Sequence, residues 1–165
     1  MGEQATLHLI CGKIAAGKST LARGLAKSPG TILIREDFWL SELYGDQMRT
    51  LADYVTFSEK LRTALEPHIV DLLRSGLSVV LDFPANTVEL RHWMRRLFEA
   101  AGCEHQLHLL DISDEICKAR LRQRNASGDH EFQVSDEQFD RVSRHFQPPT
   151  EAECFNVRLH PAGQN

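Results

Sequence analysis

The segment GKIAAGKS, Gly12 to Ser19, has the spacing of a loop that binds nucleotide phosphates. Its two glycines permit a tight backbone path with inward N–H groups, and the N-terminus of a following helix attracts anions. We expect Lys18 to contact the β- and γ-phosphates and the Ser19 hydroxyl to bind Mg²⁺. The predicted nucleotide-binding residues of this phosphate loop are Gly12, Lys13, Ala15, Ala16, Gly17, Lys18, Ser19 and Thr20. The alternative is a glycine-rich turn without a ligand.

Carboxylates follow three other predicted strands. Transfer of a phosphoryl group to an alcohol needs a group that accepts the hydroxyl proton, and Asp37 is our candidate for this base. Alternatively, Asp37 caps the helix that begins at the following residue. Asp82 ends an apolar run and is a candidate to hold Mg²⁺ through a water molecule. Alternatively, Asp82 only forms a turn before Pro84. Asp111 is a weaker candidate, because it can simply cap the next helix.

Two arginines lie on one face of a predicted helix that ends at Asn125. Arg120 and Arg124 are four residues apart, whereas Arg122 points elsewhere. A polar segment and another helix follow, which is typical of a lid whose arginines close over phosphates and stabilise transition-state charge. Alternatively, the helix dipole alone favours cations at this end.

Recognition of the acceptor is less clear from the sequence. Trp39, together with Phe38 and Tyr44, can line an acceptor pocket, and Arg91 or Arg95 can bind an acidic group on the acceptor. The alternative for the aromatic residues is a place in the core, because helices that cover a sheet need apolar faces.

Strands and helices alternate along the chain. Strands are predicted at 6–11, 31–35, 78–82, 105–110 and 155–159, and helices at 19–27, 58–75 with a kink at Pro67, 88–101, 113–125 and 135–146. This order favours an α/β fold with a parallel sheet between two layers of helices. The carboxyl ends of the strands would then bring the phosphate loop and the carboxylates together.

Composition sets further limits. The 165 residues, 42% of them hydrophobic, suit one domain over 1–165, with a lid at about 120–147. No signal segment or membrane-length apolar run is evident, so we expect a cytoplasmic protein. The four scattered cysteines indicate neither zinc nor disulfides, and the dispersed histidines indicate no metal site. The net charge of −4 argues against general attraction to nucleic acid, which as a partner is not favoured.

These motifs together resemble the P-loop kinase family of small phosphotransferases (AAA_33-like), in particular the branch with polynucleotide kinase, chloramphenicol phosphotransferase and zeta-toxin-like kinases. The resemblance is carried by GKIAAGKST, Asp37, VVLD followed by Asn86 and Thr87, and R-x-R-x-R before the lid. It implies a five-stranded parallel sheet in the order 2-3-1-4-5 within an α/β/α sandwich. It also implies ATP with Mg²⁺, Asp37 as base and lid arginines. No N-K-x-D motif of guanine-selecting proteins is present.

The leading hypothesis is therefore an ATP-dependent kinase that phosphorylates a hydroxyl of a small molecule or a nucleotide-type acceptor. Two alternatives are a polynucleotide 5′-hydroxyl kinase and a non-catalytic ATP-binding regulatory module. The stretch from Ser41 to Ser75 matches no family member well enough to identify the acceptor, and either a monomer or a homodimer is compatible with the sequence.

Overall fold

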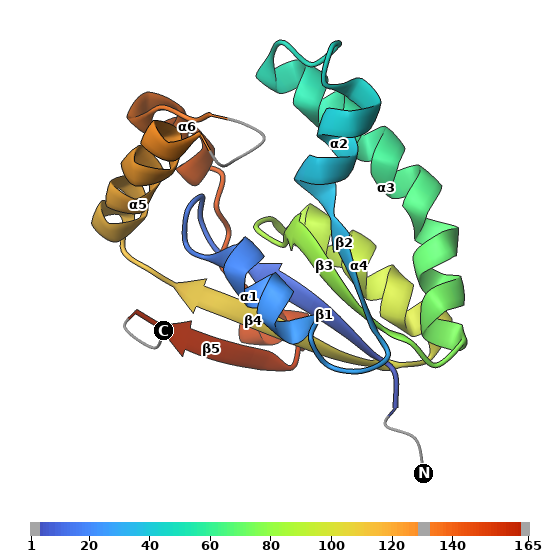
Figure 1. The fold of residues 1–165 in the computed structure, drawn as a ribbon. Helices are drawn as coiled ribbons and strands as arrows, with labels where there is room; N and C mark the ends of the chain where they lie inside the picture. Colours follow the sequence, from blue (N-terminus) through green and yellow to red (C-terminus); the bar gives the residue numbers. More distant parts are fainter. Residues whose placement is uncertain (1–3, 129–132, 163–165) are drawn as a thin grey trace.

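The computed structural model describes residues 4–128 and 133–162. Five parallel strands form a sheet in the order β2-β3-β1-β4-β5 (Figure 1). The strands are β1 Thr6–Cys11, β2 Thr31–Arg35, β3 Ser78–Pro84, β4 Glu104–Asp111 and β5 Val157–Pro161. The predicted strand order and parallel sheet are confirmed. The last strand begins two residues later than predicted, where it pairs with β4 from Val157 onward.

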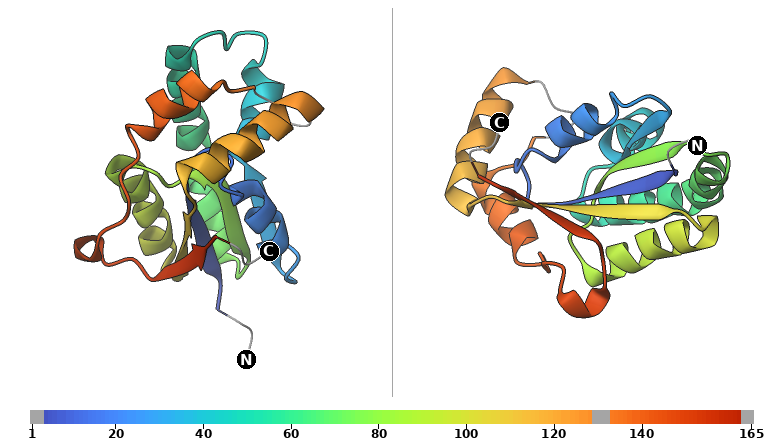
Figure 2. Two further views of the ribbon diagram at one scale, coloured as in Figure 1. Left: turned by 90° about the vertical axis from the view of Figure 1, so that its left-hand side faces the viewer. Right: turned by 90° about the horizontal axis from the view of Figure 1, so that it is seen from below.

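Helices cover both faces of the sheet (Figure 2). They are α1 Lys18–Leu25, α2 Glu36–Tyr44, α3 Leu51–Arg74, α4 Val88–Ala101, α5 Asp114–Ser127 and α6 Asp136–Ser143, with a 3₁₀ turn η1 at Glu151–Glu153. On one face, β1 residues Leu7 and Leu9 join the main core with α3 and α4. On the other face, Ile10 and Val80 pack against Ala22 of α1. Among the described residues, no helix is long and apolar enough to span a membrane.

Local sequence signals explain where several helices begin and end. Side-chain oxygens of Thr50, Thr87, Ser113 and Ser135 each accept a backbone N–H in the first turn of the following helix. Helix α4 ends at Ala101 and is capped by Gly102, whose φ of 66° suits glycine. Helix α3 continues through Pro67. Helix α6 ends at Ser143, three residues earlier than predicted.

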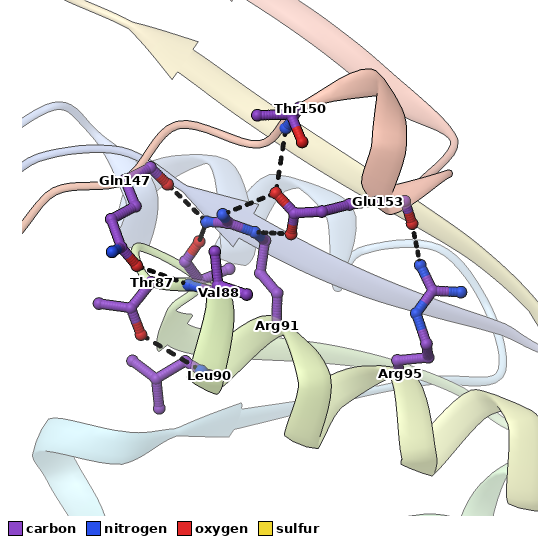
Figure 3. Close-up of polar contacts among 9 residues, drawn as sticks. Thr87, Val88, Leu90, Arg91, Arg95, Gln147, Thr150 and Glu153 are labelled. Atoms are coloured by element: carbon purple, nitrogen blue, oxygen red, sulfur yellow. Dashed lines mark hydrogen bonds and ion pairs between the residues drawn. The ribbon is translucent and has the colours of Figure 1, made fainter.

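Arg91 anchors the C-terminal part of the chain to α4 (Figure 3). Its guanidinium is fully buried, and Nε and Nη2 donate to the two carboxylate oxygens of Glu153 at 2.7 and 3.0 Å. Its Nη1 donates to the carbonyls of Ala85 and Gln147. Arg95 donates to the backbone carbonyl of Glu153. Every nitrogen of the Arg91 guanidinium is therefore used within the protein, and the predicted role of Arg91 in acceptor binding is wrong.

Replacing Arg91 by methionine is expected to lower the free energy of unfolding by about 3–5 kcal/mol, because the substitution leaves the Glu153 carboxylate without its buried partner. The melting temperature should fall by roughly 10 °C. Arg96→Met is the matched control on the same helix, since Arg96 is exposed and its ion pair with Glu66 lies at the surface. Calorimetry measures both variants, and wild-type stability in Arg91→Met would contradict this structural role.

Candidate active site

The phosphate loop joins β1 to α1 with a tight backbone path that requires glycine or another small residue at particular positions. A Cβ atom on Gly12 would lie 3.0 Å from Cβ of Leu110, so the loop needs glycine there to pass close to β4. Gly17 has a φ of 102° and caps α1, and Ala15 also has a positive φ, of 60°. The loop therefore has the tight path predicted from its sequence, and it ends at the N-terminus of α1.

Asn86 fixes the start of this loop from the neighbouring strand end. Its Oδ1 accepts the backbone N–H of Gly12 at 2.9 Å, and its Nδ2 donates to the Gly12 carbonyl at 2.8 Å. Both hydrogen-bonding groups of one residue in the loop are thus held by one amide side chain. Sequence reasoning gave Asn86 no role, although its position just after β3 at the carboxyl edge of the sheet was a usable signal.

Lys18 lies at the centre of the site. Its Nζ donates to the carbonyls of Gly12 and Lys13 at 2.7 and 2.8 Å, within the loop itself. Desolvation lowers the pKa of Lys18, and the charges of Asp82 and Asp37 oppose that shift. The lysine therefore lies within electrostatic range of both predicted carboxylates, which belong to two different elements, helix α2 and strand β3.

Asp37 lies in the first turn of α2, not at its cap. The capping residue is Arg35, and α2 begins at Glu36. The alternative interpretation of Asp37 as the helix cap is therefore wrong. A carboxylate in the first turn is still favoured by the helix dipole, and the Asp37 side chain lines the central cavity.

Asp82 lies within β3 rather than at its end. In the pairing with β1, Leu9 faces Leu81 but the next residue, Ile10, faces Pro84, so Asp82 and Phe83 form an irregularity on the β3 side. Such bulges redirect side chains and are frequent beside active sites. Asp82 lines the central cavity, as its predicted role requires.

The predicted lid consists of the C-terminal half of α5, helix α6 and adjoining residues, while 129–132 lie outside the described residues. A small apolar cluster packs α5 and α6 against the phosphate loop, with members Ala16, Ile112, Cys117, Leu121 and Phe139. Arg120 Nη1 donates to the carbonyl of Ala16 at 3.2 Å, and Arg120 and Arg124 both line the cavity. Arg122 instead pairs with Asp136 of α6. The two arginines predicted to share a face do so.

A single cavity of about 1380 Å³ connects these groups. From the phosphate loop it is lined by Ala15, Ala16, Gly17, Lys18, Ser19 and Thr20. Of the predicted nucleotide-binding residues, Gly12 and Lys13 do not line it, and the Lys13 ammonium pairs with Asp114 at 2.5 Å. The volume exceeds the roughly 300–1,000 Å³ of a typical small-molecule site, so it is large enough for two ligands.

Trp39 does not take part in this cavity. Its side chain is 41% exposed on α2 and is absent from the cavity lining, as is that of Phe38, whose ring packs under the guanidinium of Arg35. The helical periodicity of α2 turns both aromatic residues away from the cavity. The predicted acceptor contact of Trp39 is therefore wrong. Tyr54 of α3, which the sequence did not single out, lines the cavity instead.

A buried carboxyl group supports this side of the site. Glu36, next to Asp37, is only 3% exposed, and its Oε1 accepts hydrogen bonds from Ser58 and, at 3.2 Å, from the Tyr54 hydroxyl. Arg62 in turn donates to the Ser58 hydroxyl. Desolvation raises the pKa of Glu36 to about 7, with a further increase from Asp37, while the hydrogen bonds and Arg62 oppose the shift. This network fixes α3 against the end of β2.

The raised pKa of Glu36 makes a specific prediction about stability. Between pH 4.5 and about 7 the folded protein keeps a proton on Glu36 that the unfolded chain releases. The contribution of this protonated group to the free energy of unfolding is therefore fully present below pH 4.5 and is lost as pH rises to about 7. Glu36→Gln removes this dependence. The free energy of unfolding of the variant minus that of wild type, measured by urea denaturation, should therefore increase by about 3 kcal/mol between pH 4.5 and pH 8. Glu59→Gln, an exposed change on α3, should show no such trend. A Glu36→Gln effect that does not vary with pH would contradict the assignment.

Three histidines form a hydrogen-bonded row across β1, β4 and β5. His8 Nδ1 lies 3.1 Å from His108 Nε2, and His108 Nδ1 lies 2.9 Å from His160 Nε2. Burial, with contributions from the neighbouring imidazoles and Arg158, lowers the pKa of His108 to about 3. The central imidazole is therefore neutral at physiological pH. His160, at the end of the row, lines the central cavity.

Comparison with known proteins places this geometry in context. A family model described as an AAA domain, AAA_33, matches residues 7–149. No curated protein sequence matches the chain. Among solved structures, a candidate kinase from Chloroflexus aurantiacus J-10-fl is similar with a TM-score of 0.75 at 20% identity, covering 98% of this chain and 87% of that one.

Two further structures, both with bound nucleotide analogues, share the fold. Chaetomium thermophilum Kti12 with ADP-AlF3 has a TM-score of 0.72 at 14% identity, over 96% of this chain and 90% of that one. Mycobacterium tuberculosis APS kinase CysC with AMPPNP and APS has a TM-score of 0.65 at 19% identity, over 98% and 91%. The fold is therefore that of P-loop kinases, as the sequence resemblance implies, and at these identities the likeness concerns the fold alone.

Proposed function

The chain belongs to the AAA_33 family of AAA domains, and on this premise we propose that it is an ATP-dependent kinase that transfers the γ-phosphate of ATP to a hydroxyl group. One observation carries the proposal. The cavity brings Asp37 and Asp82 into electrostatic range of Lys18 at the phosphate loop. A protein that only bound nucleotide would need the loop and its lysine, but it would not need a second carboxylate, Asp37 of α2, beside the one on β3.

Each group in the cavity has a role in this reaction. The Lys18 ammonium exchanges its bonds to loop carbonyls for bonds to the β- and γ-phosphates. Asp37 accepts the proton of the acceptor hydroxyl while the hydroxyl oxygen forms a bond to the γ-phosphorus. At the same time the bond between the γ-phosphorus and the oxygen that leaves with ADP breaks. Arg120 and Arg124 stabilise the negative charge on the transferring group. The described residues of the predicted lid, 120–128 and 133–147, would exclude water from this reaction.

Mg²⁺ is the metal that this proposal requires, and the side chains present suit it. The Ser19 hydroxyl and the Asp82 carboxylate both line the cavity beside Lys18, and oxygen ligands with retained waters are what Mg²⁺ prefers. When bound, the ion would neutralise charge on the phosphate oxygens. Two protein ligands are enough in such sites, because the phosphates and water complete the coordination.

A screen of hydroxyl-bearing compounds tests the proposal. The full chain is incubated with γ-labelled ATP, Mg²⁺ and a panel of sugars, sugar acids, nucleosides and a 5′-hydroxyl oligonucleotide, with a variant that cannot bind ATP as the blank. Labelled product from one class of acceptor is the expected result. Tight ATP binding without transfer to any acceptor would favour the regulatory module, and transfer only to the oligonucleotide would favour the polynucleotide kinase. The predicted cytoplasmic location stays a prediction.

A further inference from the structure

Lys13, the second residue of the phosphate loop, does not line the cavity, although residues 14–20 of the same loop do. Its ammonium group instead makes two contacts, one with a carboxylate and one with an aromatic ring. Neither partner, Asp114 or Phe146, lines the cavity. The loop therefore carries a cation whose contacts lie outside the proposed nucleotide site.

The two partners of Lys13 lie at opposite ends of the helical unit that carries the lid arginines. Asp114 is the first residue of α5, and its Oδ1 lies 2.5 Å from Lys13 Nζ. Phe146 follows α6, and the centre of its ring lies 5.6 Å from the same nitrogen. We call the described residues 114–128 and 133–146 the α5–α6 unit; its two helices lie beside the phosphate loop (Figure 1). One ammonium group thus contacts the chain where it enters this unit and where it leaves it.

The chain that follows the α5–α6 unit fixes the Phe146 end. Phe146 packs against the main core. The backbone N–H of the next residue, Gln147, donates to the Asn86 carbonyl at 2.8 Å, and the Gln147 carbonyl accepts from Arg91 (Figure 3). Lys13 therefore contacts the unit at a fixed end, and the helices between the two contacts are the part that is free to change position during closure.

The main chain of Lys13 contacts the lysine that we propose to bind phosphate. The Lys13 carbonyl accepts hydrogen bonds from Lys18 Nζ at 2.8 Å and from the Ala16 N–H at 3.1 Å. The Ala16 carbonyl in turn accepts from Arg120 of α5. A shift of the Lys18 ammonium on binding phosphate therefore acts on the residue that contacts both ends of the α5–α6 unit. The phosphate site and the lid are connected through contacts between neighbouring residues.

Each contact of Lys13, taken alone, has a simpler explanation. A carboxylate in the first turn of a helix is favoured by the dipole, and the Lys13 and Asp114 side chains are 26% and 51% exposed, so their ion pair adds little to the stability of the fold. The dipole does not explain why the same ammonium also lies over a ring at the other end of the unit. Lys118 makes similar contacts, with Asp140 at 2.7 Å and with the Phe139 ring at 5.7 Å, but all three of these residues lie within the unit.

We propose that Lys13 is a positioning residue that couples nucleotide binding at the phosphate loop to closure of the lid, by holding Asp114 and Phe146 on one ammonium group. The inference rests on the proposed function. With Lys13 in place, the α5–α6 unit closes from ends that are joined to the loop, and Arg120 approaches the phosphates in a defined orientation. Without the Lys13 charge this connection is lost, and bound nucleotide no longer orders the unit.

Protection of backbone amides by nucleotide tests the coupling. Hydrogen exchange of the full chain is followed by mass spectrometry with and without AMPPNP and Mg²⁺. In wild type the nucleotide should slow exchange in both α1 and α6. In Lys13→Met it should slow exchange in α1 but not in α6, because the phosphate loop still binds. The Kd for AMPPNP should rise by about three- to tenfold, as expected for loss of an exposed ion pair and a cation–ring contact. Lys13→Arg keeps the charge and should retain most of the coupling.

Two measurements separate this coupling from general destabilisation. The melting temperature of ligand-free Lys13→Met should stay within about 3 °C of wild type, because the lost ion pair is exposed. Lys118→Met is the matched control, since it removes a similar ion pair and ring contact inside the α5–α6 unit. It should bind AMPPNP and protect α6 like wild type. Equal loss of α6 protection in Lys118→Met and Lys13→Met would overturn the assignment to Lys13.

A double-mutant cycle tests the connection to α5. Asp114→Asn should also weaken AMPPNP binding, and the variant with both substitutions should bind no more weakly than Lys13→Met alone, because the two residues act through one contact. Additive losses would mean that Asp114 acts only on its own helix, which contradicts the connection.

The coupling and the kinase function fail in different ways. Protection of α6 at the wild-type level in Lys13→Met overturns the coupling and leaves the kinase function in place. Protection of α6 that depends on Lys13, without transfer to any compound in the acceptor screen, supports the coupling and contradicts the kinase function. Absence of AMPPNP binding by wild type would overturn both.

Discussion

Replacing Lys18 by alanine is expected to abolish ATP-dependent activity. The substitution removes the only cation that lies within the phosphate loop and faces both Asp82 and Asp37 among the described residues. Loss of one group that stabilises developing charge typically lowers kcat by about 10²–10³-fold. Affinity for ATP should fall as well, because the ammonium also contacts the phosphates of the ground state.

Thermal stability gives a second measurement of Lys18→Ala. A ligand at a hundred times its Kd adds about 2.7 kcal/mol, which corresponds to ~5–10 °C for a chain of this size. Wild type should show this increase with ATP and Mg²⁺, and the variant should not. Lys27→Ala is the control, since Lys27 is exposed beyond α1 and outside the cavity lining. An unchanged ATP-induced shift in Lys18→Ala would mean that the nucleotide binds elsewhere.

Replacing Asp37 by asparagine is expected to separate binding from catalysis. The amide keeps the shape of the side chain in the first turn of α2 but cannot accept the acceptor proton at neutral pH. General base catalysis contributes about 10²–10⁴-fold, so kcat should fall by this factor while the Kd for ATP stays close to wild type. Single-turnover transfer and calorimetric titration measure the two quantities.

The control for this substitution is Asp46→Asn, which changes an exposed carboxylate in the segment between α2 and α3 that does not line the cavity. It should transfer phosphate like wild type. Full transfer activity in Asp37→Asn would remove Asp37 as the base. In that case Asp82 would be the next carboxylate to test, because it also lines the cavity and lies within electrostatic range of Lys18.

Much of the fold follows from short-range patterns. The phosphate loop lies where its glycine spacing predicts. Strand β2 and helix α4 have the predicted boundaries, because a glycine or a capping residue marks an end of each and their apolar residues have the spacing of a strand and of a helix. The parallel order of strands follows from their alternation with helices and from the family resemblance. These features depend on neighbours in the chain, which a sequence displays directly.

The parts that were missed depend on pairs distant in the chain. Arg91 finds Glu153 across 62 residues, and Asn86 finds Gly12 across 74. Local spacing in the sequence does not reveal that Glu153 is the partner of Arg91 or that Gly12 is the partner of Asn86. For this reason the sequence suggests acceptor binding for Arg91 and assigns Asn86 no functional role. The predicted contact of Trp39 is wrong for a different reason: Asp37 of α2 lines the cavity, and Trp39, two residues later in the helix, points in another direction.

The row of three histidines has a consequence for how the cavity can communicate with β1, two strands away from β5 in the sheet. A neutral imidazole has one N–H and one acceptor nitrogen, so both hydrogen bonds of the row form only if all three rings adopt the same tautomer. With Nε2–H in every ring, His160 has an acceptor at its remaining nitrogen; with Nδ1–H in every ring, it has a donor there. A ligand that prefers one of these at His160 therefore sets the tautomer of His8, two strands away, without moving the backbone.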